Sequence, residues 1–152
     1  MSEQKKYEFT GKIKTIFGIE FKQIRAIISF GCVVAGEIGG WIECEENLSQ
    51  SGNAWVFGDA RVSGNARVSG DARVKKDDDY MVIGGAGRYN RFTTFFKCRD
   101  KTIKVICGCF FGTIIEFRAK VKETHKGNKH EKVYLAMADM AELQIGNDEV
   151  EK

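Results

Sequence analysis

The 152-residue chain contains no proline, although it contains 17 glycines. Its tight backbone corners therefore depend on glycine, which adopts positive φ angles without steric cost, and this is typical of a β-rich fold with many turns. Neither sign of charge dominates, because 24 basic residues accompany 21 acidic ones and the net charge is only +3. The sequence has no cluster of cations without interspersed acids, so we expect no specific DNA binding.

Long apolar segments are missing as well. No apolar run reaches the roughly 18 residues of a membrane span, and the first residues, MSEQKKYEF, lack the apolar core of a signal peptide. We therefore expect a soluble, cytosolic protein with no membrane partner. The five cysteines are an odd number without secretory context, which favours reduced thiols over disulfides.

The N-terminal segment has the alternating pattern of a β-hairpin. Tyr7, Phe9 and Ile13 precede a corner at Phe17-Gly18, and Ile19 and Phe21 follow it. Two period-2 runs joined at a glycine predict two antiparallel strands. The next stretch, VVAGEIGGWIE, is interpreted as the lead-in to the following segment, whose first apolar layer Trp41 and Ile42 would cover.

Residues 51–74 read SGNAWVFGDARVSGNARVSGDARV, which is a six-residue unit of the form x-G-[ND]-A-x-V written four times. In a strand, residues i and i+2 share a face, so each alanine and the valine two positions later point the same way. The inward pairs are Ala54 and Val56, Ala60 and Val62, Ala66 and Val68, and Ala72 and Val74; the outward residues are Trp55, Arg61, Arg67 and Arg73. The Gly-Asn and Gly-Asp pairs supply a corner before each short strand. The pattern predicts a solenoid with flat sides that buries a continuous ladder of alanine and valine.

This Ala-x-Val spacing resembles the hexapeptide repeat of left-handed β-helices. The stretch GEIGGWIECEENLSQSGNAWVFGDARV, together with RFTTFFKCRDKTIKVICGCFFGT, is similar to a family of bacteriophage and prophage proteins that carry variable numbers of these units. The resemblance implies a short left-handed β-helix and a phage origin, but no settled activity. Three such units usually complete one turn, so four units make little more than one. Open ends need covering, by the N-terminal segment, the C-terminal domain or a second subunit, and we expect a homo-oligomer, either a dimer or a trimer.

The predicted fold is therefore mainly β with an α+β C-terminal part: an N-terminal β-hairpin, a short left-handed β-helix, then strands followed by two helices. We expect one domain over 1–76, a second over 80–146 and a disordered tail over 147–152. The charge cluster at 75–79 is interpreted as a solvated link between them.

The C-terminal part begins with two predicted strands around the turn Arg99-Asp100-Lys101. Their apolar faces would hold Phe92, Thr94, Phe96 and Cys98 in one strand, and Ile103, Val105, Cys107 and Cys109 in the other. Thr113 and Glu116 form a capping box that opens a helix with an apolar stripe of Ile114, Phe117 and Val121. A second helix from about Lys129 would bury Val133, Met137 and Met140.

The sequence contains few residues that are suited to catalysis. The acyltransferases and carbonic anhydrase relatives built on hexapeptide coils require histidines as a general base or as zinc ligands. The chain has only His125 and His130, both in the polar stretch KETHKGNKHEK, where we expect solvated helix ends. Cys98, Cys107 and Cys109 lack a Cys-x-x-Cys knuckle and are interpreted as core residues, so we predict no metal, no cofactor and no catalytic set.

The best candidate site is the stretch VIGGAGRYNRFTT. Glycines allow backbone amides to approach an anion closely, arginines form bidentate bonds to phosphate, and a tyrosine can stack on a base. Thr93 is expected to point away from the apolar face, with its hydroxyl available to a ligand. The predicted ligand-binding residues are Gly84, Gly85, Gly87, Arg88, Tyr89, Asn90, Arg91, Thr93 and Thr94. The alternative reading of this stretch is a mobile glycine loop between domains.

Two functions remain in competition. The first is a phage-type, non-enzymatic binding protein that captures a small anionic, nucleotide-derived ligand, such as a signal of host defence. The alternative is a structural or protein-interaction module that oligomerises through the β-helix. A nucleotide hydrolase acting through threonine or histidine is the third hypothesis, which the sequence favours least.

Overall fold

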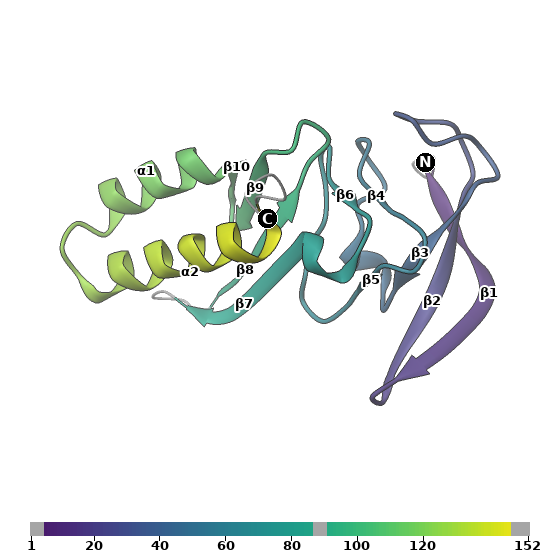
Figure 1. Ribbon diagram of the computed structural model, residues 1–152, viewed down its shortest axis with the longest axis horizontal. Helices are drawn as coiled ribbons and strands as arrows, with labels where there is room; N and C mark the ends of the chain where they lie inside the picture. Colours follow the sequence, from purple (N-terminus) through teal and green to yellow (C-terminus); the bar gives the residue numbers. More distant parts are fainter. Residues whose placement is uncertain (1–4, 87–90, 147–152) are drawn as a thin grey trace, which may run out of the picture. The chain divides into compact units, whose positions relative to one another are not determined.

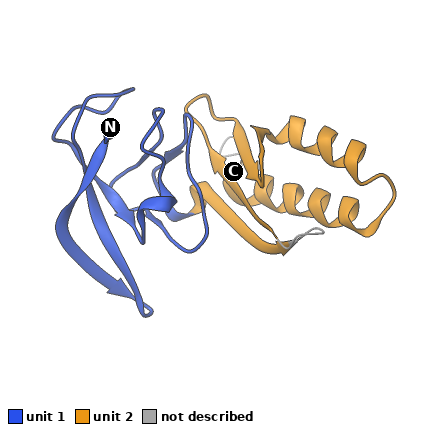
Figure 2. Ribbon diagram, turned by 180° about the vertical axis from the view of Figure 1, so that it is seen from behind, with its two compact units in different colours: residues 1–77 blue, residues 78–152 orange. Residues whose placement is uncertain are grey.

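The structure is a computed structural model that describes residues 5–86 and 91–146. The chain divides into two compact units, residues 1–77 and residues 78–152 (Figure 2). The predicted fold class is confirmed: strands predominate, and two helices follow the last strands of the chain (Figure 1). The tail predicted to be disordered, 147–152, lies outside the described residues.

Unit 1 begins with the predicted hairpin. Strand β1 (Tyr7–Ile16) pairs antiparallel with β2 (Ile19–Ala26), and the corner between them consists of Phe17 at φ 51° and Gly18 at φ 81°. Two consecutive residues with positive φ match the twist of the flanking strands. Strand β3 (Ile38–Ile42) then pairs antiparallel with β2 and leads the chain into the repeat.

The repeat forms a coil of stacked short strands. Strand β4 (Trp55–Val56) pairs in parallel with β6 (Arg73–Val74), so three six-residue units complete one turn. On the other two sides β3 pairs in parallel with β5 (Arg61–Val62), and Leu48 pairs with Val68. Ile42 and Leu48 therefore take the place of valines in the first turn, and the coil contains more turns than the four units alone would make. The left-handed winding that the resemblance implies stays a prediction.

The inward ladder of the coil is confirmed. All its alanines and valines are at most 2% exposed: Ala54, Val56, Ala60, Val62, Ala66, Val68, Ala72 and Val74. The glycine at each corner has a positive φ, as the turn requires: Gly52, Gly58, Gly64 and Gly70. Stacking of the two turns buries this ladder as one small core.

Trp55 departs from the prediction that it points into solvent with the arginines. Its side chain is fully buried, and its indole ring packs against the rings of Tyr7 and Phe30, with centroids 6.2 Å and 5.3 Å away. Gly39 makes this possible, because a Cβ atom there would overlap the indole. The outward face of this strand is thus a second core, which the N-terminal segment covers.

The N-terminal segment also satisfies backbone groups of the first turn. Amide groups of that turn donate to carbonyls of the next turn, as Asn53 does to Gly70 and Trp55 to Ala72. The buried Nζ of Lys6 donates to the carbonyls of Ala54 at 2.8 Å, Gly52 at 3.3 Å and Ser51 at 3.4 Å.

Two further contacts complete this cap. The hydroxyl of Tyr7 donates to the carbonyls of Leu48 at 2.7 Å and Glu45 at 3.2 Å, and Nζ of Lys6 lies 4.7 Å from the centroid of the Phe30 ring. Lys6 and Tyr7 thus donate the hydrogen bonds that a further turn of the coil would otherwise donate to these carbonyls. The covering of this end by the N-terminal segment is one of the arrangements that the sequence left open.

Unit 2 is an antiparallel sheet with helices. The strands are β7 (Tyr80–Ala86), β8 (Arg91–Lys97), β9 (Ile103–Cys107) and β10 (Phe110–Thr113), in the order β10-β9-β8-β7. Helix α1 (Ile114–Thr124) begins with the predicted capping box of Thr113 and Glu116, and α2 (Lys129–Ile145) follows a short turn. The expected single strand from 101 to 112 is in fact a hairpin, which turns at Gly108 and Cys109.

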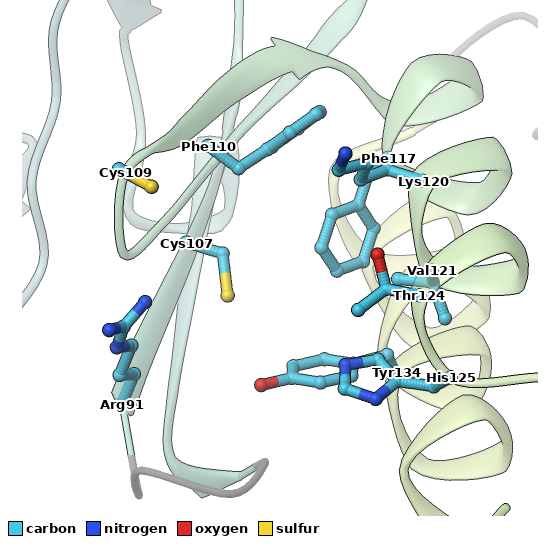
Figure 3. A pocket seen from close by; sticks show the side chains of 10 residues that line it. All are labelled: Arg91, Cys107, Cys109, Phe110, Phe117, Lys120, Val121, Thr124, His125 and Tyr134. Carbon is cyan, nitrogen blue, oxygen red and sulfur yellow. The ribbon is translucent and has the colours of Figure 1, made fainter.

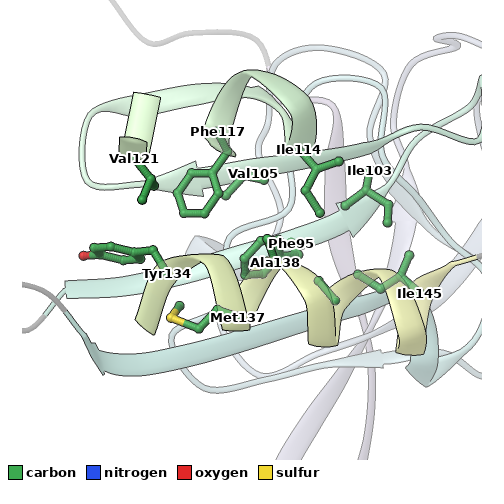
Figure 4. Close-up of a cluster of buried hydrophobic side chains, with 11 residues drawn as sticks. Phe95, Ile103, Val105, Ile114, Phe117, Val121, Tyr134, Met137, Ala138 and Ile145 are labelled. Atoms are coloured by element: carbon green, nitrogen blue, oxygen red, sulfur yellow. The ribbon is translucent and has the colours of Figure 1, made fainter. Parts of the chain in front are cut away.

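The core of unit 2 lies between the sheet and the helices (Figure 4). Phe95 and Val105 of the sheet meet Phe117 of α1, with the rings of Phe95 and Phe117 5.7 Å apart. The predicted stripe of α1 is confirmed as buried. The predicted face of β8 is wrong in part, because Phe92 is 47% exposed whereas Phe95 is fully buried.

The buried face of α2 also differs from the prediction. Met137 is buried as expected, but Val133 and Met140 are 38% and 50% exposed. The helix buries instead the set Tyr134, Met137, Ala138, Ala141 and Ile145. Two small residues on this face, Ala138 and Ala141, allow the helix to approach the sheet closely. The hydrophobicity of the side chains alone does not predict that these alanines are buried.

The charge cluster at 75–79 is only partly solvated. Asp77 is exposed and its Oδ2 accepts from Nη2 of Arg61 at 2.6 Å, whereas Asp79 is 3% exposed in a 3-10 turn (Asp77–Asp79). Neither described helix contains an 18-residue apolar stretch of the kind needed to cross a bilayer.

Lys6 generates a prediction about pH. Burial lowers the pKa of Lys6 from 10.5 to about 8. Between pH 8 and pH 10.5 the unfolded chain binds a proton that the folded chain has lost, so the free energy of unfolding rises with pH in this window. We expect the unfolding free energy of the native protein, minus that of Lys6→Met, to grow by about 2 kcal/mol between pH 7.5 and 9.5.

Urea unfolding at several pH values, with reductant present, measures this difference. The methionine variant keeps every other titrating group, including Tyr7 and Cys44, whose pKa values burial raises, so their contributions cancel. Lys12→Met, on the exposed side of β1, is the matched control and should show no such growth. A pH-independent difference for Lys6→Met would contradict the prediction.

Candidate functional site

A pocket of about 270 Å³ lies within unit 2, between the β9–β10 turn and the two helices (Figure 3). Its lining comes from the start of β8, the β9–β10 hairpin, the last two turns of α1 and the first turns of α2. The residues are Arg91, Cys107, Cys109, Phe110, Phe117, Lys120, Val121, Thr124, His125 and Tyr134. The segments that form it are far apart in the sequence, and the hairpin between β9 and β10 brings them together.

One wall of the pocket is apolar and aromatic. The rings of Phe110 and Phe117 lie with their centroids 5.7 Å apart, and the ring of Phe117 also meets that of Tyr134 at 5.8 Å. Val121 continues this wall one turn further along α1. The helix orients these side chains, because Phe117 and Val121 are four residues apart and therefore share its inner face. A flat apolar group of a ligand would find its contact here.

Cations lie at both ends of the pocket. The guanidinium of Arg91 lies beside the β9–β10 turn, and Lys120 projects from α1 (Figure 3). The backbone at Gly108, with φ 60°, holds Arg91 close, because a Cβ atom at this position would overlap Nη1 of the guanidinium. A glycine at this corner therefore has two functions: it permits the turn, and it leaves room for the arginine.

Two polar side chains of the pocket lining, Cys107 and Tyr134, lie close together, and the buried Thr93 lies behind them. The hydroxyl of Thr93 donates to Sγ of Cys107 at 3.2 Å, and the phenol of Tyr134 lies beside the same thiol. The pKa of Tyr134 is raised to about 12, first by burial and then by the neighbouring Cys107, while the charge of Arg91 opposes this effect. The phenol therefore keeps its proton at neutral pH and can donate a hydrogen bond into the pocket.

The two histidines are placed at the helix ends, as predicted, but they are not simply solvated. His125 is half-buried and its ring stacks on that of Tyr134, with centroids 5.6 Å apart and planes 28° apart. The ring of His130 meets His125 edge-on at 5.5 Å. His125 caps the C-terminal end of α1, and its ring forms part of the pocket lining.

Among the residues predicted to bind a ligand, Arg91 lines this pocket. Gly84 and Gly85 lie in β7 rather than in a loop: the ring of Phe92 packs over Gly84, and Gly85 adopts φ 75° at a register shift between β7 and β8. Gly87, Arg88, Tyr89 and Asn90 lie outside the described residues.

The orientation predicted for Thr93, with its hydroxyl exposed, is wrong. Its side chain is fully buried and its hydroxyl bonds to Cys107, because Thr93 and Phe95 occupy the face of β8 that the helices cover. Thr94, on the opposite face, is also buried, at 2% exposure. Neither side chain is exposed at the surface.

One cysteine was also misassigned. Cys98 is a core residue as expected, at 3% exposure, and Cys107 is half-buried, packs against the core and also lines the pocket, but Cys109 is exposed at the rim of the pocket. The sequence signal for this was the Cys-Gly-Cys triplet, since a glycine between apolar strands marks a hairpin turn that ends the strand phase. Within the part of the chain that the structure describes, no three metal-ligating side chains converge.

No protein-family model matches the chain. A stretch of 51 residues, 34% of the chain, is 41% identical to the protein named Uncharacterized acetyltransferase YdcK of Escherichia coli (strain K12). The chain covers only 15% of the length of that relative. The likeness is thus local, and the bacteriophage family that the repeat resembles stays a prediction.

Gly108 provides a test of the site geometry. Gly108→Ala places a Cβ at a positive φ and against Arg91, whereas Gly127→Ala meets the same φ penalty, at φ 72°, in open space. We expect a loss of about 1–2 kcal/mol in unfolding free energy for Gly127→Ala and a loss of the same size for Gly108→Ala, because the exposed guanidinium of Arg91 can move away from the new Cβ. Urea denaturation of both variants checks this. A much larger loss for Gly108→Ala would show that Arg91 is held rigidly against the turn.

Proposed function

We propose that unit 2 binds a small anionic ligand of the nucleotide type in this pocket and captures it without converting it. The observation that carries the proposal is an aromatic wall with a cation at each end: Phe110 and Phe117 between Arg91 and Lys120. A flat base would pack on the rings, and an anionic group would bind the guanidinium of Arg91. The protonated phenol of Tyr134 would add a hydrogen-bond donor beside it.

The size of the pocket restricts the ligand. Its volume of about 270 Å³ lies just below the range of roughly 300–1,000 Å³ typical of small-molecule sites. A mononucleotide or a comparable fragment suits this volume better than an extended dinucleotide does. We therefore expect the base or the phosphate of a larger ligand to remain outside the pocket.

Capture without turnover fits the polar groups that the pocket offers. Cys107 accepts a hydrogen bond from Thr93 and lies beside a phenol that burial keeps protonated, so these two neighbours offer the thiol hydroxyl donors rather than a general base. His125 stacks on Tyr134 with its ring plane close to parallel, which is a packing contact. A protein that removes a nucleotide signal from solution needs affinity and abundance only, and sequestration is the role that we propose.

Binding is tested by calorimetry with nucleoside monophosphates and cyclic nucleotides on the full chain. We expect micromolar affinity for at least one of them, lowered about tenfold or more by Arg91→Gln, because a charge-assisted hydrogen bond contributes about 1.5–3 kcal/mol. Arg99→Gln is the matched control, since Arg99 is an exposed arginine in the β8–β9 turn, away from the pocket.

The outcomes separate the hypotheses. Mass spectrometry of the ligand after incubation should return it unchanged, and a converted product would replace capture with catalysis. Equal losses for Arg91→Gln and Arg99→Gln would place the ligand elsewhere. Failure of every nucleotide to bind at millimolar concentration would remove the proposal.

A further inference from the structure

One side of α2 remains exposed although it carries a row of apolar residues. Val133, Met140 and Leu143 are 38%, 50% and 86% exposed, and the exposed Ala136 lies between them. Their spacing alternates between three and four residues, which places them in one stripe along a helix. The core of unit 2 is filled by another side of α2, so this stripe, which we call the outer stripe, lies outside the core that the described residues form.

The charges beside the outer stripe follow a pattern. Lys132 and Asp139 are seven residues, or close to two helical turns, apart, so they lie on the same flank of the stripe, with opposite signs. Both are exposed. The carboxylate of Asp139 already accepts from Nη2 of Arg118 at 2.7 Å, but its side chain is 71% exposed and a carboxylate has several acceptor positions.

We infer that the outer stripe is an interface between two copies of this chain, with the two α2 helices antiparallel about a two-fold axis near Ala136. In this arrangement Val133 of one copy meets Met140 of the other, and Lys132 of each copy meets Asp139 of the other. The small side chain of Ala136 at the axis allows the two helices to approach closely. Such a contact is self-complementary, as a two-fold interface requires.

The same charges favour the antiparallel arrangement. In a parallel pair the two-fold axis runs along the helices and places the same flank of the two copies on opposite sides of the interface, so Lys132 and Asp139 of one copy would not pair with those of the other. The antiparallel arrangement also places the aliphatic stem of Lys129 over Leu143 of the other copy, which covers the most exposed apolar residue of the stripe. The inference concerns a surface separate from the ligand pocket and does not rest on the proposed function.

The charges allow an exchange experiment on the full chain, followed by sedimentation velocity in reducing buffer over a range of concentrations. Lys132→Asp alone and Asp139→Lys alone each place like charges across the axis, so we expect each to weaken the dimer about tenfold or more. In an equimolar mixture of the two variants, both ion pairs form again between unlike chains. We therefore expect the mixture to recover the dimer, which a structural defect in either variant would not allow.

A second pair of variants tests the apolar part. Leu143→Glu should shift the native protein toward monomer, whereas Ile115→Glu should not, because Ile115 is a comparably exposed residue, at 76%, on α1 and outside the outer stripe. Far-UV circular dichroism confirms that each variant is folded. A native protein that is monomeric at all concentrations, a dimer that Leu143→Glu leaves intact, or a mixture that fails to recover would each overturn the inference.

Discussion

The short coil of unit 1 depends on the hydrogen bonds that cap the open side of its first turn. In a long solenoid every carbonyl accepts from the neighbouring turn, and the cost of the ends is shared over many repeats. Here the first turn has no preceding turn, and Lys6 and Tyr7 donate to five of its carbonyls instead. A lysine is suited to this position because its ammonium group provides three donors from one atom at the end of a long apolar stem.

Burial of that lysine has an electrostatic cost, which its lowered pKa expresses. The adjacent Phe30 ring offsets part of the cost through its negative face, and the same ring packs on Trp55. The hairpin, the cap and the outward face of β4 are therefore one cooperative unit. A change at any of these positions should loosen the coil at the end where it begins, rather than along its ladder of alanine and valine.

In unit 2 the turn at Gly108 has the corresponding importance for the site. It ends β9 after Cys107, reverses the chain, and directs Phe110 back toward α1. The pocket exists because this hairpin and the ends of the two helices leave a space that their side chains line but do not fill. The side chain of Arg91 extends from β8 past Gly108 toward this pocket. The backbone conformation at Gly108 therefore determines the positions of both Phe110 and Arg91.

Much of the fold was predictable from local patterns. The hairpin at Phe17-Gly18, the inward alanines and valines, the glycine corners and the capping box at Thr113 each depend on residues within a few positions of one another, and each was predicted correctly. The site was less predictable. Arg91 was identified from the composition of its stretch, whereas Cys107, His125 and Tyr134 are separated by long intervals and meet only through packing.

Sequence by itself therefore determined the period of the coil, the position of its corners and the start of α1, because steric limits on φ and the alternation of side chains act locally. Tertiary structure decided which further faces are buried besides the inward face of the coil and the stripe of α1. Trp55 and Thr93 both lie on faces that alternation assigned to solvent, and each is buried because a distant segment covers it: the N-terminal residues over Trp55, the helices over Thr93. The alternation of side chains predicts which residues share a face of a strand, but the segment that packs on that face decides whether it is buried.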